Sequence, residues 1–169
     1  AGQGRMSEDN MFAELQIEFI TEALFLMEQY EESMLALESK ENLTEHLAII
    51  FRVAHSIKGG GAAVGFEDLG RFAHSVEDLL ALLRMDPELI SPDVVSLLLK
   101  SGDAFKNRHS ELKSQPPPVW DIEGLHLEVK AKVNSLQGAS DSPTPQAPSN
   151  LPEPAVAGPA ADFEVFPDL

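Results

Sequence analysis

Apolar residues recur through most of the chain in steps of three and four, the spacing of one face of an α-helix. The first run predicts a helix over residues 9–38, with Ser7 as its cap, and the second opens at Asn42 or Thr44 and ends at Gly65. No stretch alternates long enough to indicate a strand. The expected inward stripe of the first helix is Phe12, Leu15, Phe19, Ala23, Leu26, Tyr30, Met34 and Leu37.

Two further helices follow with short connections. The third is expected over residues 67–84, and Asp86 and Pro87 end it. Ser91 followed by Pro92 is typical of a helix start, an N-cap and then proline at the first helical position. The pattern therefore predicts an all-α fold, an antiparallel up-down four-helix bundle.

The pattern changes after residues 116–118, which are three prolines. Asp121 can cap a fifth helix with an apolar face over 122–136, which predicts one domain over residues 9–137. Residues 1–8 are expected to be a disordered start that resembles an added tag. Residues 138–169 contain 7 Pro, 5 acidic residues and no Lys or Arg, which predicts a disordered linker or tail. Its apolar end, residues 162–169, is either a docking motif or a frayed end.

The composition of the chain excludes several classes of partner and of active site. The 169 residues are 43% apolar and 24% charged, as in one soluble domain. Asp plus Glu number 28 against 12 Lys plus Arg, a net charge of −16, which argues against nucleic acid or an anionic membrane as partner. With no Cys there is no disulfide, thiolate zinc site or Cys nucleophile. No signal peptide or membrane span is visible, which predicts a cytoplasmic protein.

The most informative segment is residues 54–61. Its His55 is turned about 100° from the core stripe, and Arg52, Gly59 and Ala62 share its face. Successive glycines inside a helix cost about 1 kcal/mol each relative to alanine. Close approach by a partner would explain that cost, so Arg52, Gly59, Gly60 and Ala62 are candidate partner-binding residues.

Charged residues can complete a site around this histidine. Lys58 lies one turn after His55, near any group attached to the ring. If the second and third helices are adjacent and antiparallel, Glu77 can reach His55. A carboxylate that accepts from Nδ1–H fixes the tautomer and leaves the Nε2 lone pair free to attack. Glu77 lies off the core stripe, so we expect its loss to affect His55 more than the bundle. Alternatively, His74 and Glu77 form only a solvated pair.

These residues resemble the histidine-phosphotransfer (HPt) domain that opens chemotaxis histidine kinases of the CheA type. The likeness covers residues 10–136 and is carried by HSIKGG at 55–60, by Gly65 and Phe66, and by the spacing of His55 to His74 and Glu77. Gly61 stands where this family often has Ala, and Val64 replaces the usual Phe. These departures concern local packing.

The resemblance implies that His55 is the phosphoacceptor. A kinase catalytic domain, in the same or another chain, would donate the γ-phosphoryl group of ATP, and an Asp of a CheY- or CheB-type response regulator would receive it. Lys58 would offset phosphoryl charge, His74 would lie beside it and Glu77 would orient the ring. The chain would bind no cofactor, because ATP and Mg²⁺ would serve partner domains. The domain is expected to be monomeric and not catalytic alone.

Three other interpretations stay open. The chain could be a stand-alone HPt protein in a multistep phosphorelay, or a helical adaptor without chemistry, which would tolerate the loss of His55. A metal-binding bundle is the third, but the paired Glu-x-x-His motifs of di-iron bundles are replaced by a single reversed pair, His74 and Glu77. We therefore expect no metal site.

Overall fold

The computed structural model describes residues 2–141, and within that range the chain is helical, with no strand. The all-α prediction is confirmed. The elements are α1 (Gly2–Glu38), α2 (Leu43–Ala63), α3 (Glu67–Met85), the 3₁₀ turn η1 (Pro87–Leu89), α4 (Pro92–Glu111) and α5 (Glu123–Asp141).

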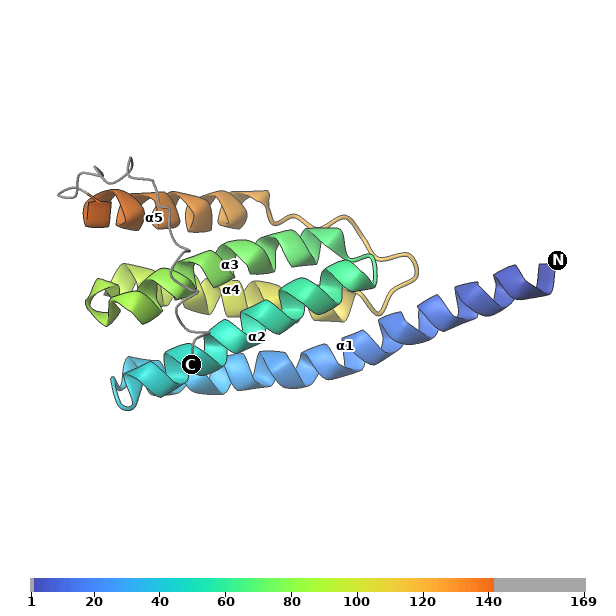
Figure 1. The fold of residues 1–169 in the computed structure, drawn as a ribbon, viewed down its shortest axis with the longest axis horizontal. Coiled ribbons are helices and arrows are strands. Elements are labelled where there is room, and N and C mark those ends of the chain that lie inside the picture. The colour runs from blue at the N-terminus through green and yellow to red at the C-terminus, as the bar shows by residue number, and fades with distance from the viewer. Residues whose placement is uncertain (1, 142–169) are drawn as a thin grey trace, which may run out of the picture. The chain divides into compact units, whose positions relative to one another are not determined.

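The first four helices form the predicted bundle. Helix α1 packs against α2 and α4, and α3 packs against α2 and α4, with neighbours antiparallel (Figure 1). Each helix contributes fully buried side chains to one core, such as Tyr30, Ile50, Phe72 and Phe105. Two edge-to-face ring contacts, Tyr30 with Phe105 and Phe72 with Phe105, join α1, α3 and α4 in its centre.

Helix α1 differs from the sequence prediction at its start. It begins at Gly2 and not near Asp9, so residues 2–8, expected to precede the helix, belong to it, while residue 1 lies outside the described residues. Phe12 and Leu15, expected to be inward, are 44% and 46% exposed. Phe12 lies at the turn between α2 and α3, where a Cβ on Gly65 would come within 3.4 Å of its ring. The earlier turns of α1 extend past this turn (Figure 1).

The core register of α1 also shifts by one residue near its middle. Met27 is 2% exposed and belongs to the core, whereas Leu26, the expected core residue, is only partly buried. A strict three-four repeat cannot tell adjacent apolar positions apart, because both can lie at the edge of the buried face.

The predicted fifth helix is present and packs on α3 and α4. Its Val129 and Val133 are buried in the main core, and the Ser75 hydroxyl of α3 lies 2.7 Å from Nε2 of His126. Burial, helped by Lys130, lowers the pKa of His126, so its neutral ring can accept this hydrogen bond. The helix continues to Asp141, four residues past the expected domain end. The predicted disordered tail from residue 142 onward lies outside the described residues.

Arg108 of α4 fastens the segment that leads into α5. Its guanidinium pairs with Asp68 of α3 at 3.1 Å and donates to the Pro118 carbonyl at 2.7 Å. It also lies 5.4 Å from the centre of the Trp120 ring, and that ring contacts Phe72 edge-on. Because Arg108 is buried, these contacts offset the cost of taking its charge out of water.

Small residues let α2 and α3 approach closely near the turn that joins them. A Cβ atom on Gly70 of α3 would lie 3.2 Å from the Lys58 carbonyl oxygen and 3.4 Å from the Ala62 Cβ of α2. A Cβ on Gly61 would lie 3.4 Å from the Phe66 carbonyl. Larger side chains at these positions would separate the two helices along the whole crossing.

The other two glycines of the run have different surroundings. A Cβ on Gly60 would lie 2.7 Å from a ring atom of Phe19 on α1, so this glycine serves internal packing and not the open approach expected for it. A Cβ on Gly59 would meet nothing within 4 Å. Packing inside the bundle therefore explains why positions 60 and 61 are glycine. It does not explain the glycine at position 59.

This contrast can be tested by unfolding. Alanine improves helix propensity by about 1 kcal/mol at either position, but at Gly60 it also overpacks the Phe19 ring, which costs about 1–3 kcal/mol. We expect Gly59→Ala to stabilise the domain and Gly60→Ala to be less stable than Gly59→Ala by about 1–3 kcal/mol in urea unfolding. Equal stability of the two variants would contradict the packing seen at Phe19.

Candidate functional site

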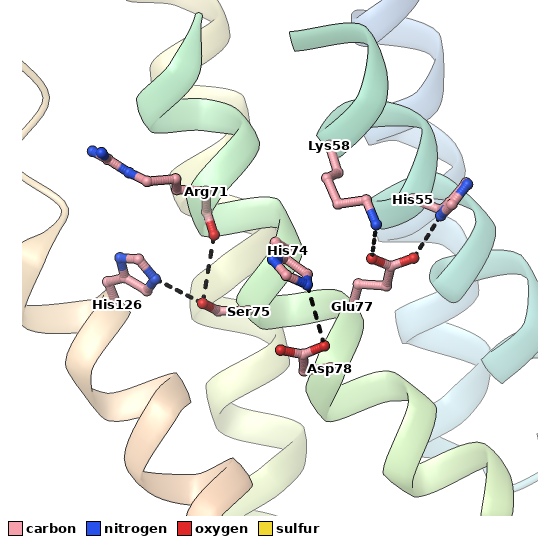
Figure 2. A network of polar contacts seen from close by, with 8 residues as sticks. All are labelled: His55, Lys58, Arg71, His74, Ser75, Glu77, Asp78 and His126. Atoms are coloured by element: carbon pink, nitrogen blue, oxygen red, sulfur yellow. Dashed lines mark hydrogen bonds and ion pairs between the residues drawn. The ribbon is translucent and has the colours of Figure 1, made fainter. Parts of the chain in front are cut away.

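One carboxylate joins α2 to α3 at the centre of the site. Nδ1 of His55 lies 2.5 Å from Oε2 of Glu77, and Nζ of Lys58 lies 2.6 Å from Oε1 of the same group. Figure 2 shows the His55 and Lys58 side chains of α2 converging on the Glu77 side chain of α3. The sequence allowed this contact on the condition that the two helices are adjacent and antiparallel, and α2 and α3 meet that condition.

The ionisation of the Glu77 carboxylate decides which ring nitrogen of His55 carries the proton. Burial alone would raise the pKa of Glu77, but hydrogen bonds and charges from Lys58 and His55 outweigh it and hold that pKa below its ordinary value. An ionised carboxylate can only accept hydrogen bonds. Nδ1–H of His55 must therefore donate to this carboxylate, and when the ring carries only that proton its lone pair is on Nε2.

The other side of the ring is open. The His55 side chain is 61% exposed, so a reactant can reach Nε2 without a change in the bundle. A neutral imidazole with a free Nε2 lone pair, oriented through Nδ1 by a carboxylate, is the arrangement of a nucleophile or a general base.

Glu77 is more deeply set than its sequence position indicated. It is 7% exposed, and both of its carboxylate oxygens have partners on α2. Its burial follows from the close crossing of α2 and α3, which carries an edge position of α3 into the interface. From this burial we expect the loss of Glu77 to weaken the pairing of the two helices as well as to affect His55, more than its position off the core stripe indicated.

Lys58 and His74 lie differently from what the sequence suggested. The Lys58 ammonium is bound to Glu77, on the Nδ1 side of the His55 ring. His74 makes a 3.6 Å contact with Asp78 of its own helix, drawn as a dashed line in Figure 2. A pair between His74 and Glu77, the alternative considered above, does not form.

Two hollows lie beside the paired side chains of α2, and Glu77 lines one of them. The one beside the phosphoacceptor candidate has a volume of about 290 Å³ and is lined by Ala48, Phe51, Arg52, His55, Glu77 and Arg84. The other, of about 320 Å³, is lined by Lys58, Ala62, Glu67, Gly70, Arg71 and His74. Among the predicted partner-binding residues, Arg52 therefore lies beside His55, whereas Ala62 lines the second hollow.

Phe51 and Arg84 were missed in the sequence. Phe51 precedes His55 by four residues, and Arg84 follows Glu77 by seven, so each lies on the same helix face as the site residue. Phe51 resembled any partly buried aromatic, and Arg84 resembled a favourable cation in the last turn of α3. Their shared hollow appears only when the two helices are packed together.

No group of three His, Asp or Glu side chains in residues 2–141 is arranged to hold a metal ion. None of the helices that the structure describes combines the length and apolarity needed to cross a membrane.

Comparison with known families matches residues 14–115 to the Hpt domain. The chain is 40% identical over 118 residues to chemotaxis protein CheA of Treponema pallidum, which covers 70% of this chain and 14% of that protein. It is 31% identical over 147 residues to CheA of Klebsiella aerogenes, which covers 87% of this chain and 22% of that protein. The chain thus spans less than a quarter of these curated relatives.

A solved structure has the same fold. The phosphorylated P1 domain of CheA3 from R. sphaeroides, in complex with CheY6, superposes with a TM-score of 0.65 at 24% sequence identity. The match covers 73% of this chain and 98% of that one, so the helical architecture of the two domains is shared.

The pKa of Glu77 leads to a pH prediction. Because its folded-state pKa lies below the ordinary 4.5, its stabilising contribution is full above that pH and is lost as the pH falls through the lower folded value. We expect the difference in unfolding free energy between the parent and Glu77→Gln to be largest at neutral pH. It should shrink steadily below pH 4.5 in urea titrations.

Glu128→Gln is a matched control, since Glu128 pairs with Lys100 at an exposed site and such pairs contribute little. Its stability difference from the parent should be small at every pH. A difference for Glu77→Gln that stays constant from neutral to acid pH would contradict the ionised pairing.

Proposed function

Because the chain belongs to the Hpt domain family, we propose that it is the phosphotransfer domain of a CheA-type chemotaxis histidine kinase and that His55 is its phosphoacceptor. The similarity to CheA proteins supports the type of kinase. The observation that carries the chemistry is the bond from Nδ1–H of His55 to the ionised Glu77, made by an imidazole that is otherwise exposed.

The first step takes a phosphoryl group from ATP held by a kinase catalytic domain, in the same or another polypeptide. Nε2 of His55 attacks the γ-phosphorus, the bond to the bridging oxygen breaks, and ADP leaves with that electron pair. The Nδ1 proton stays in place, so the ring becomes cationic beside the Glu77 carboxylate. Glu77 stabilises this charge and holds the lone pair in the right direction.

The second step passes the group to a response regulator of the CheY or CheB type. A carboxylate oxygen of its Asp attacks the phosphorus, the N–P bond breaks, and neutral imidazole leaves with the electron pair. Imidazole is a good leaving group, which suits a carrier. Mg²⁺ would assist from the partner, as would ATP in the first step, so this chain needs neither. We place the relay in the cytoplasm, where ATP is available, with one copy of the domain sufficient.

Lys58 supports the carboxylate in this scheme. Its ammonium, 2.6 Å from Glu77, keeps the carboxyl ionised and so keeps the proton on Nδ1 of His55. It also supplies positive charge on the buried side of the ring, where it offsets part of the phosphoryl charge at longer range.

Gly59 keeps the approach to the ring open. It lies one turn after His55 on the same face, and nothing in the bundle would oppose a side chain there. A partner that brings an atom in line with Nε2 must come close to this surface, with Arg52 at its edge. The absence of a side chain at Gly59 therefore serves the partner and not the fold.

Labelling tests the phosphoacceptor. With labelled ATP and a CheA-type kinase catalytic domain, we expect the parent to take up an acid-labile label and His55→Gln to take up none. His74→Gln is the matched control and should keep its label, because His74 lies on α3 and outside the hollow beside His55. Undiminished labelling of His55→Gln would overturn the assignment and favour a helical adaptor.

Gly59→Ala tests the approach. Although the methyl group should raise stability, it stands beside the reacting nitrogen, so we expect phosphorylation to slow about tenfold, the effect of roughly 1.4 kcal/mol in the barrier. The rate is measured with the same kinase domain under subsaturating conditions. An unchanged rate in this more stable variant would remove the role given to Gly59.

A further inference from the structure

The hollow beside His55 is cationic in a chain whose net charge is −16. Arg52 from α2 and Arg84 from α3 both line it. In the part of the chain that the structure describes, neither guanidinium belongs to an ion pair. Glu77 is the only carboxylate in the lining, and both of its oxygens are already bound by His55 and Lys58.

Arg84 is held in place through an aromatic ring. Its guanidinium carbon lies 4.7 Å from the centre of the Phe51 ring, a cation–π contact between α3 and α2. The Phe51 ring is itself nearly parallel to the His55 imidazole, at 14° with the ring centres 6.3 Å apart. The contact therefore positions a cation from α3 in the hollow that His55 also lines, although Arg84 is exposed.

Lys58 cannot supply the same charge at the same place. Its ammonium is bound to Glu77, and it lines the second hollow with His74 and not the hollow of His55. A phosphoryl group on Nε2 would carry two negative charges on the exposed side of the ring. The cations that line the hollow of His55 are the guanidiniums of Arg52 and Arg84, whose paired N–H groups match phosphate oxygens.

We propose that Arg84, positioned by Phe51, binds the non-bridging oxygens of the phosphoryl group that His55 accepts, with Arg52 as a second cation at the edge of the hollow. This rests on the proposed function. Arg84 donates hydrogen bonds and exchanges no proton: the phosphorus moves from the ADP oxygen to Nε2, and the guanidinium neutralises charge on the oxygens during the transfer. Arg84 thus becomes a phosphoryl-binding residue of the site.

Two phosphodonors separate phosphoryl binding from partner docking. The first is labelled ATP with a CheA-type kinase catalytic domain. The second is phosphoramidate, a small molecule that needs no protein partner: Nε2 attacks its phosphorus, the P–N bond breaks, and ammonia leaves after taking a proton from water. Any residue that only docks the kinase domain affects the first reaction alone.

We expect Arg84→Gln to slow phosphorylation of His55 from both donors by about 10- to 100-fold, the effect of losing a hydrogen bond to a charged group. With the kinase domain, the loss should fall on kcat more than on KM. Arg84→Lys should recover part of the rate, and Phe51→Leu should lose part of it. Arg71→Gln is the control, because Arg71 lies on the same helix but lines the second hollow, and it should leave both rates unchanged.

The opposite results are equally clear. Normal rates for Arg84→Gln with both donors overturn the proposal. A loss confined to the kinase-driven reaction, with a raised KM, also overturns it and makes Arg84 a docking residue. If the parent accepts no label on His55 from either donor, the proposed function itself fails. Melting temperatures near that of the parent, expected for an exposed residue, exclude unfolding as the cause of any loss.

Discussion

The site depends on one interaction, the sharing of the Glu77 carboxylate between His55 and Lys58. This carboxylate is almost removed from solvent yet kept ionised by its two partners, and it crosses from one helix to the next. The protonation of Nδ1, the availability of Nε2 and the position of Lys58 all follow from it. Such a bond is possible only where α2 and α3 pack closely, and Gly61, Ala62 and Gly70 provide that packing.

Different faces of helix α3 carry the residues of the reactive site and the residues that stabilise the fold. The face toward α2 carries Glu77 and Arg84, whose groups meet at the exposed hollow. Other positions on the helix, Phe72 and Ser75, contact Trp120 and His126 in and before α5. Because the fifth helix and the Arg108 cluster add buried contacts away from His55, the site can keep an exposed ring and an open glycine, which contribute little to folding.

The hollow beside His55 differs in charge from the chain as a whole. The surface as a whole is strongly acidic, which disfavours nonspecific contact with other polyanions. Beside His55 the balance is locally reversed, with Arg52 and Arg84 lining the hollow and Lys58 bound to the same carboxylate as the ring. A short-range cationic hollow can attract a phosphoryl group at contact distance even where screening weakens the field of the whole molecule.

The helical pattern was sufficient to predict the bundle and its fifth helix, because three-four periodicity and short connections restrict how amphipathic helices pack. It brought Glu77 within reach of His55 only on the condition that their helices are adjacent. It could not show that Gly60 packs against the Phe19 ring while no side chain lies near Gly59. A run of identical residues does not indicate which of them will have neighbours in space. Nor could it show that His74 turns to Asp78, that Glu77 is buried, or that Arg84 reaches Phe51. Those features depend on the distance and rotation between α2 and α3, which side-chain packing between helices decides and local sequence does not.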